Sequence, residues 1–225
     1  MGERRGEGGS YTLIDALSLD PHSLNESLQL STDANVYDTL VGRNKDLTVA
    51  PLLATSWKQT SPTVWRFELR KGVKFHDGTP FTADDVLFTF KRAAGEGSDM
   101  KGYTSSFKEV RKIDDHTIEI ETIAPNPILP DVISIVGMMS KKWCEDNKAE
   151  QAVDRRKGIE NTASFKANGT GPFRLKERQP SVRTVLTRNF SYWDKVPSNL
   201  DEVVFTPISN DATRVAALLS GEIDV

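Results

Sequence analysis

The sequence predicts a mixed α/β fold, in which short strands and amphipathic helices alternate along one chain. Two segments, Val64–Arg70 and His116–Ile123, alternate apolar and charged residues as half-exposed antiparallel strands do. A third segment, Asn210–Val225, places apolar residues at helical spacing after a polar capping residue and before Gly221. These patterns together favour an α/β or α+β protein over an all-helical or all-strand one.

The first seventy residues predict a strand, a helix and a second strand. The apolar and β-branched run Tyr11–Leu19 predicts a buried strand that ends at an Asp-Pro turn. Helical spacing of apolar residues predicts a helix over Ser31–Leu40, with Ser31 or Thr32 as its N-cap. Val64–Arg70 predicts a strand with two faces: the core face carries Trp65, Phe67 and Leu69, and the solvent face carries Arg66, Glu68 and Arg70.

The stretch LRKGVKFHDGTPFTADDVLFTF (residues 69–90) concentrates titratable side chains: His76, Asp77, Asp84 and Asp85. Its Asp-Gly pair indicates a tight turn, because Gly78 can take the positive φ that such turns require. Thr82 is placed as the N-cap of a following helix, and carboxylates in a first helical turn complement its free N–H groups. Val86, Leu87 and Phe90 should face inward. We therefore expect this stretch to shape the chain and not to catalyse a reaction.

The second half of the chain predicts further strands and helices. Ile118 and Ile120 should face one side of the strand His116–Ile123, which an Asp-Asp turn precedes. A helix is expected to begin near Pro127 or Pro130, since proline suits the first helical turn. Polar surface structure should follow over Lys141–Gly158. The remaining expected elements are the strands Thr184–Asn189 and Leu200–Ser209 and a final helix capped by Asn210 or Asp211, with Val215, Leu218 and Leu219 inward.

The composition excludes several classes of protein. The chain has 225 residues and a net charge of -3, and its 29 basic residues are scattered, which is not the pattern of a nucleic-acid-binding protein. No apolar run is long enough to span a membrane. Cys144 is the single cysteine, so neither an internal disulfide nor a multi-cysteine metal site is possible.

Motifs of known enzyme classes are missing from the sequence. The three histidines, His22, His76 and His116, do not have metal-ligand spacing. The chain has neither a nucleophile elbow nor a CxxC pair. The segment Asn168–Leu175 (NGTGPFRL) is glycine-rich but lacks the Lys-Ser/Thr of a phosphate loop, so it indicates a sharp turn into a strand. We expect no catalytic residue, metal or cofactor, and a hydrolase remains a distant alternative.

The two ends of the sequence also carry expectations. Residues 1–10 (MGERRGEGGS) are polar and glycine-rich, which predicts a flexible leader, and they lack the apolar core of a signal peptide. The last residues, LLSGEIDV, end on an apolar valine with no polar tail. We therefore expect the sequence to be a fragment of a longer protein.

Several motifs in register carry a resemblance to a known family. They are SLDPHSLNESLQL, VYDTLV, PLLATSW, WRFELRKGVKFHDGTPFTADDVLFTF, DDHTIEI, GTGPFRL, LTRNFSYW and RVAALLSGEIDV. Together they resemble the extracytoplasmic solute-binding proteins of ABC importers, in the peptide/nickel (dipeptide- and oligopeptide-binding) family. The resemblance implies a two-lobed α/β clamp of the periplasmic-binding-protein type II, with a small α+β domain inserted in the first lobe.

The same resemblance implies a division of the chain. Residues 11–42 and 169–225 would form the first lobe, incomplete, and residues 43–168 the inserted domain. The second lobe would be absent from this chain. Ligand would lie in the cleft between the two lobes, held largely by backbone hydrogen bonds. The protein would deliver it to an ABC permease, from the periplasm or, in Gram-positive bacteria, from a membrane-tethered position outside the cell.

The resemblance also implies ligand-binding positions: Asn25, Ser27, Tyr103 and Met138. Asn25 stands where some relatives have a carboxylate for the ligand amine, so such an ion pair is not expected here. Tyr103 matches an aromatic residue that some relatives turn toward the ligand, and surface packing is an equal alternative for it. Met138 and Met139 would line an adaptable pocket edge or, more simply, fill the core. The same fold could also serve as a sensor, chaperone or regulatory module, and the ligand, a peptide or related solute, is not identified by the sequence.

Overall fold

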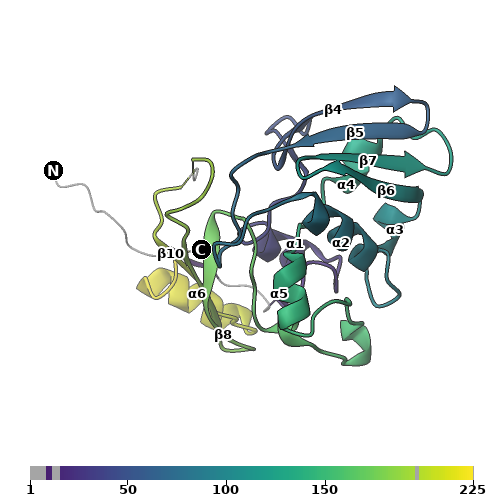
Figure 1. The fold of residues 1–225 in the computed structure, drawn as a ribbon. Helices are drawn as coiled ribbons and strands as arrows, with labels where there is room; N and C mark the ends of the chain where they lie inside the picture. The colour runs from purple at the N-terminus through teal and green to yellow at the C-terminus, as the bar shows by residue number, and fades with distance from the viewer. Residues whose placement is uncertain (1–8, 12–15, 196–197, 225) are drawn as a thin grey trace.

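The computed structural model describes residues 9–11, 16–195 and 198–224. Within these ranges two four-stranded sheets lie at opposite ends of the molecule, with helices between and beside them (Figure 1). The first sheet is built from segments far apart in the sequence, in the order β1 (Gly9–Tyr11), β10 (Glu202–Phe205), β9 (Arg183–Arg188), β8 (Phe173–Gln179). β1 runs parallel to β10, and the other pairs are antiparallel. The predicted mixed α/β class is confirmed.

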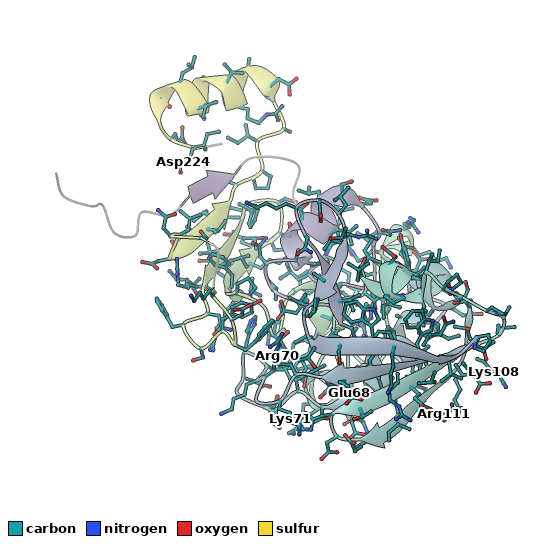
Figure 2. The ribbon with its side chains drawn as sticks, turned by 90° about the horizontal axis from the view of Figure 1, so that it is seen from above. Glu68, Arg70, Lys71, Lys108, Arg111 and Asp224 are labelled. Atoms are coloured by element: carbon teal, nitrogen blue, oxygen red, sulfur yellow. The ribbon has the colours of Figure 1, made fainter. Side chains whose placement is uncertain are left out.

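The second sheet is antiparallel throughout, in the order β4 (Ala54–Ser61), β5 (Val64–Leu69), β7 (Thr117–Thr122), β6 (Phe107–Asp114). Phe67 pairs with Ile118 in the ladder between β5 and β7, and both side chains are fully buried. On the opposite face Arg66 forms an ion pair with Glu119 at 2.7 Å. The predicted two-faced strands are therefore confirmed, in the predicted register. Charged side chains that include Lys108 and Arg111 cover the outer face (Figure 2).

Helix α2 (Ala83–Ala93) covers the inner face of this second sheet. Val86 and Phe90 are buried against the sheet, and the Phe90 ring meets Phe107 edge-on with 5.2 Å between ring centroids. The helix begins as predicted, because the Thr82 N–H donates to the Asp85 carboxylate at 2.9 Å. Gly78 in the preceding turn has a φ of +89°, also as predicted. This stretch has the structural role that its sequence indicated.

Two expectations near the N-terminus are wrong in their bounds. The expected strand Tyr11–Leu19 is not a strand over residues 16–19, and residues 12–15 lie outside the described residues. The only strand here is β1, which begins at Gly9, within the expected leader; residues 1–8 lie outside the description. The expected helix Ser31–Leu40 is instead α1 (Ser27–Asp33).

The chain leaves α1 early because its next residues pair with a distant segment. The backbone carbonyls of Asn35 and Val36 accept hydrogen bonds from the N–H groups of Phe173 and Gly171, each at 2.9 Å. A Cβ atom at Gly169 would lie 1.9 Å from the Val36 carbonyl oxygen, so only glycine permits this approach. The apolar residues that suggested a longer helix are buried in two different cores: Val36 packs with Phe173, and Leu40 packs in the core that contains Phe67.

The glycine-rich turn 168–171 also forms hydrogen bonds with the Asp-Gly turn at Asp77 and Gly78, which precedes α2. Asn168 Oδ1 accepts the Asp77 N–H at 3.0 Å, and Asn168 Nδ2 donates to the Asp77 carboxylate at 2.9 Å. The His76 backbone N–H donates to the Gly169 carbonyl at 2.9 Å. Two turns that are 91 residues apart are therefore joined by hydrogen bonds, and both have a structural role.

The remaining elements are short until the last helix. A separate two-stranded ribbon, β2 (Val41–Arg43) and β3 (Val49–Pro51), precedes the second sheet. Helix α3 (Lys101–Thr104) lies between β5 and β6 in the chain. After β7 follow α4 (Leu129–Ile133), α5 (Lys141–Asp146) and the 3₁₀ turns η1 (Arg155–Lys157) and η2 (Thr162–Ser164). Pro130 lies in the first turn of α4, as predicted. The polar surface structure expected after Lys141 is confirmed, although Cys144 within it is buried.

Helix α6 (Asp211–Ser220) has the predicted caps but not the predicted packing. Asn210 Oδ1 accepts the Thr213 N–H at 2.9 Å, and Gly221 ends the helix with a φ of +76°. The three residues expected to face inward are exposed by 57%, 49% and 83%: Val215, Leu218 and Leu219. The helix lies apart from the main body (Figure 2). Its apolar stripe therefore has no covering among the described residues, and that expectation is wrong for this chain.

Candidate functional site

Two of the expected binding residues meet at the surface, although they are 78 residues apart in the sequence. Asn25 is exposed in the segment before α1, and Tyr103 is half-buried on α3. Asn25 Nδ2 donates to the Tyr103 hydroxyl oxygen at 3.0 Å. Ser27, also exposed, is the first residue of α1 and lies next to them. The structure thus places three of the four expected residues in one region.

Met138, the fourth expected residue, has no exposed surface. It belongs to the core between α2 and the second sheet, and its N–H donates to the Asp38 carbonyl at 2.8 Å. Met139 is buried as well, in the second core around Tyr37 and Phe173. In this structure both methionines fill the core, the simpler of the two roles that the sequence left open.

The segment that carries Asn25 has open main-chain groups. Glu26 has φ -120° and ψ 144°, which is β conformation. In the described part of the chain, the Asn25 carbonyl and the Ser27 N–H have no hydrogen-bond partner. An extended segment with free N–H and C=O groups can accept another strand along its edge.

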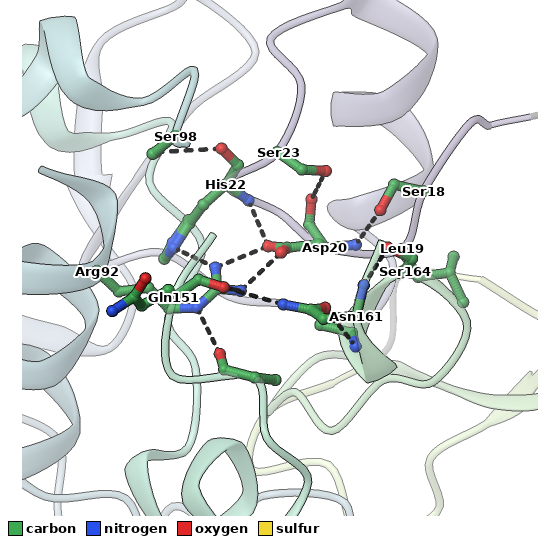
Figure 3. A network of polar contacts seen from close by, with 12 residues as sticks. Ser18, Leu19, Asp20, His22, Ser23, Arg92, Ser98, Gln151, Asn161 and Ser164 are labelled. Atoms are coloured by element: carbon green, nitrogen blue, oxygen red, sulfur yellow. Dashed lines mark hydrogen bonds and ion pairs between the residues drawn. The ribbon is translucent and has the colours of Figure 1, made fainter. Parts of the chain in front are cut away.

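A fully buried ion pair fixes the position of Asp20, a few residues before this segment (Figure 3). Arg92 Nη2 on α2 lies 2.6 Å from Asp20 Oδ2, and neither side chain has exposed surface. The same guanidinium donates to the Ala149 carbonyl at 2.9 Å. Burial alone would raise the pKa of Asp20, but the nearby Arg92 charge lowers it below its usual value. The pair joins α2 to the segment before α1.

His22 completes this network in a single neutral tautomer. Its Nδ1 accepts from Arg92 Nη1 at 3.0 Å, so Nε2 carries the proton and donates to the Gly137 carbonyl at 3.0 Å. Burial, together with the adjacent Arg92 charge, lowers the pKa of His22 to about 4. His76 is held in the same way between the Gly169 N–H and the Gly171 carbonyl, and its pKa is also lowered to about 4, mainly by burial. Both histidines have structural roles.

Two further residues at the site were missed by sequence reasoning. The Asp99 carboxylate accepts the Asn25 backbone N–H at 3.2 Å and also pairs with the guanidinium of Arg156 on η1. The three residues come from segments that are 74 and 57 residues apart. No local pattern marks Asp99 or Arg156, because their partners are set by the fold alone.

A cavity of about 280 Å³ lies behind α1, between that helix and the residues that follow α4. Asp33 lines it and is almost completely buried. Gln29 Nε2 donates to Asp33 Oδ2 at 2.8 Å, but Asp33 Oδ1 has no hydrogen-bond partner. Burial raises the pKa of this carboxyl well above its usual value. The cavity therefore contains a carboxyl group that favours the protonated form.

The described residues include neither a metal-binding cluster nor an activated thiol. No group of three or more His, Cys, Asp or Glu side chains is placed to hold a metal ion in the part of the chain that the structure covers. Burial raises the pKa of the Cys144 thiol to about 12, which disfavours the nucleophilic thiolate. No helix among the described residues is both long and apolar enough to span a bilayer.

Comparison with known proteins identifies the family. The family model "Bacterial extracellular solute-binding proteins, family 5 Middle" matches residues 48–225. The periplasmic oligopeptide-binding protein OppA of Escherichia coli is 26% identical over 92% of this chain and 40% of its own length. The glutathione-binding protein GsiB of Pectobacterium atrosepticum is 29% identical over 91% of this chain and 38% of its own. The chain thus spans about two fifths of the curated relatives it matches.

A solved structure agrees with this result. The ABC transporter-associated periplasmic binding protein DppA of Helicobacter pylori, in complex with the peptide STSA, superposes with a TM-score of 0.84 at 28% identity. The match covers 98% of this chain and 46% of the DppA chain. The fold expected from the sequence, part of a periplasmic binding protein, is confirmed. The chain belongs to family 5 of the bacterial extracellular solute-binding proteins.

Proposed function

We propose that this chain is part of the substrate-binding component of an ABC importer. The component captures a peptide or a related small solute outside the cell membrane, in a cleft between two lobes, and delivers it to a membrane permease. Family membership and the likeness to a peptide-bound DppA support this proposal. In the same proposal residues 11–42 and 169–225 belong to the first lobe, and residues 43–168 form the inserted domain.

The observation that carries the proposal is the pair of open main-chain groups on either side of Glu26, which has β conformation. The free Asn25 carbonyl and the free N–H of Ser27 can bond to the main chain of a peptide laid beside them. Main-chain bonds give affinity that does not depend on the ligand's side chains, which suits a protein that takes up varied peptides. Asn25 is uncharged, so the ligand amine is not neutralised at this position.

Tyr103 contributes a further group beside this segment. Its hydroxyl oxygen accepts from Asn25 Nδ2, so its own O–H proton is free to donate to a ligand oxygen. The ring, half-buried, offers apolar area for a ligand side chain. Asn25 and Ser27 of the first lobe and Tyr103 of the inserted domain are thus our proposed ligand contacts, whereas Met138 is a core residue with no exposed surface.

The test uses the full-length native protein. Small molecules that co-purify with the native protein are identified by mass spectrometry, and binding of di- to pentapeptides is measured by calorimetric titration. We expect a peptide-like ligand and micromolar or tighter binding. Failure of every peptide to bind, with a non-peptide solute recovered instead, would contradict the proposal.

A pair of variants at Ser27 tests the main-chain contact directly. Ser27→Pro removes the N–H group, and proline is suited to the first position of α1 after an extended residue. Ser27→Ala keeps the N–H group and removes only the hydroxyl. We expect Ser27→Pro to weaken binding by about tenfold, as for one lost hydrogen bond, and Ser27→Ala to bind like the parent. Equal affinities for the two variants would exclude the Ser27 N–H as a ligand contact.

A further inference from the structure

We propose that Arg156 is a positioning residue for the ligand-facing segment, acting through Asp99 on the backbone of Asn25. This inference rests on the proposed function for its biological meaning, but its geometry is independent of any ligand. Arg156 lies on η1, far along the chain from Asn25, and its hydrogen bonds reach the segment through the Asp99 carboxylate.

The local structure of η1 fixes the direction of Arg156. Asp154 caps the turn by accepting the Arg156 backbone N–H at 3.1 Å, and Gly158 closes the turn with a φ of +71°. Both terminal nitrogens of the guanidinium donate to Asp99, one to each carboxylate oxygen. This two-point contact sets the plane of the carboxylate as well as its distance.

Asp99 in turn is fixed at its own backbone. Its N–H donates to the His22 carbonyl at 2.9 Å, and the neighbouring Ser98 hydroxyl donates to the same carbonyl at 3.1 Å (Figure 3). With its backbone and its carboxylate both held, Asp99 Oδ2 presents a fixed acceptor to the Asn25 N–H at 3.2 Å. This hydrogen bond orients the peptide unit between Leu24 and Asn25. The carbonyl of Asn25, in the next peptide unit, is placed as a consequence.

Arg156 also sets the charge next to the segment. The Asp99 side chain is 15% exposed, so its carboxylate would present a negative charge beside the ligand if the guanidinium were removed. Glu26 adds a second carboxylate close enough to act on Arg156. With the pair intact, the guanidinium of Arg156 neutralises the charge of the Asp99 carboxylate. Without Arg156, a ligand with a free amine gains an attractive charge that an N-acetylated ligand cannot use.

The exposure of Arg156 separates positioning from stability. The side chain is 61% exposed, and ion pairs with such exposure contribute little to folding free energy. An effect of Arg156 on the site should therefore appear in the Asn25 amide and in ligand preference, while the melting temperature stays near that of the parent.

The first experiment needs no ligand. The backbone amide resonance of Asn25 is followed by ¹H–¹⁵N NMR in the present chain and in Arg156→Gln, Asp99→Asn and the double variant. We expect Arg156→Gln to shift the resonance in the parent background and to cause no further shift in the Asp99→Asn background, because the effect passes through that carboxylate. Lys157→Gln is the matched control, since Lys157 is on the same turn but pairs with Asp154. An unchanged Asn25 resonance in Arg156→Gln would overturn the proposal.

The second experiment compares two peptides of one sequence, with a free and with an acetylated N-terminus, on the protein as its gene encodes it. We expect Arg156→Gln to shift the affinity ratio toward the free amine by about fivefold, the scale of one partly exposed charge pair. An unchanged ratio would overturn the charge argument. If neither peptide binds the parent, the proposed function fails, whereas the amide measurement still decides whether Arg156 positions Asn25.

Discussion

Arg92 and Asp20 form an ion pair with no exposed surface, in which Nη2 and Oδ2 lie 2.6 Å apart. The two residues are 72 positions apart in the sequence, so the pair ties α2 to the segment that leads into the candidate site. Its cost of desolvation is offset by further hydrogen bonds from the guanidinium to the Ala149 carbonyl and to His22.

Removing one member of this pair should strongly destabilise the protein. Arg92→Met leaves the Asp20 carboxylate buried without its partner, and we expect a loss of about 3–5 kcal/mol in the free energy of unfolding. Urea denaturation at neutral pH measures it. The double variant Asp20→Asn/Arg92→Met should lose less than the sum of the single variants, since it leaves no unpaired charge. Single variants within about 1 kcal/mol of the parent would show that the pair is dispensable.

The two neutral histidines predict acid sensitivity. The pKa values of His22 and His76 are lowered in the folded state to about 4 from a usual value of 6.5. Protons therefore bind the unfolded chain first, and the stability that these residues contribute is complete above pH 6.5 and is lost as the pH falls toward 4. The loss is about 3 kcal/mol at most for each histidine.

Variants separate these histidines from other titrating groups. In His76→Gln the side chain can still accept and donate a hydrogen bond but cannot be protonated. We expect its melting temperature to fall less than that of the parent between pH 6.5 and pH 4. His116→Gln is the control, because His116 is half-buried in the turn between β6 and β7 and belongs to neither of the two hydrogen-bond networks. Parallel curves for the parent and His76→Gln would contradict the prediction.

Asp33 predicts the opposite dependence on pH. Its pKa is raised in the folded state by burial, so its contribution to stability is present below its unfolded pKa and is lost as the pH rises through the folded value. Asp33→Asn removes the buried ionisable carboxyl and keeps an oxygen for Gln29 Nε2. We expect the variant to be more stable than the parent by about 1 kcal/mol at pH 7. The difference should shrink toward pH 4, and a variant less stable than the parent at pH 7 would show that the charge is compensated.

Gly78 should not tolerate a β-branched side chain. Its φ of +89° is unfavourable for any residue with a Cβ atom, although no neighbour lies within 4 Å of the Cβ position. We expect Gly78→Val to cost about 1 kcal/mol or more, from the backbone alone. Gly102→Val is the matched control, since that position also has open space but no positive φ. Thermal melts compare them, and equal melting temperatures would contradict the argument.

The parts of the fold that were predictable are those set by neighbouring residues. Alternation along Val64–Leu69 and Thr117–Thr122 determined the buried faces of β5 and β7, because side chains of a strand point to opposite faces in turn. Thr82 and Gly78 determined the start of α2 and the turn before it, because capping and positive φ are local requirements. Where a structure depends on two or three adjacent residues, the sequence suffices.

The parts that were not predictable depend on distant partners. The helix expected over Ser31–Leu40 ends early because Asn35 and Val36 pair with Gly171 and Phe173, which no local pattern indicates. At the site, the sequence pointed to Asn25 and Tyr103 through resemblance, but Asp99 and Arg156 acquire their roles only when three separate segments meet. Helix α6 is a different case: its sequence has the pattern of an amphipathic helix, but no other part of the described chain covers its apolar face.

The last prediction concerns what the 225-residue chain binds when it is measured by itself. In our proposal a ligand is held between two lobes, and this chain spans only about two fifths of its OppA relative. The Asn25–Tyr103 region would then supply one wall of the cleft, while the ligand still loses most of its freedom on binding. If two walls give a dissociation constant of about 1 μM, or about -8 kcal/mol, half of that free energy corresponds to about 1 mM. We expect calorimetric titration of this chain to show no peptide affinity tighter than about 100 μM. A micromolar peptide would mean that the Asn25–Tyr103 wall carries most of the binding free energy, contrary to a cleft in which both walls share it.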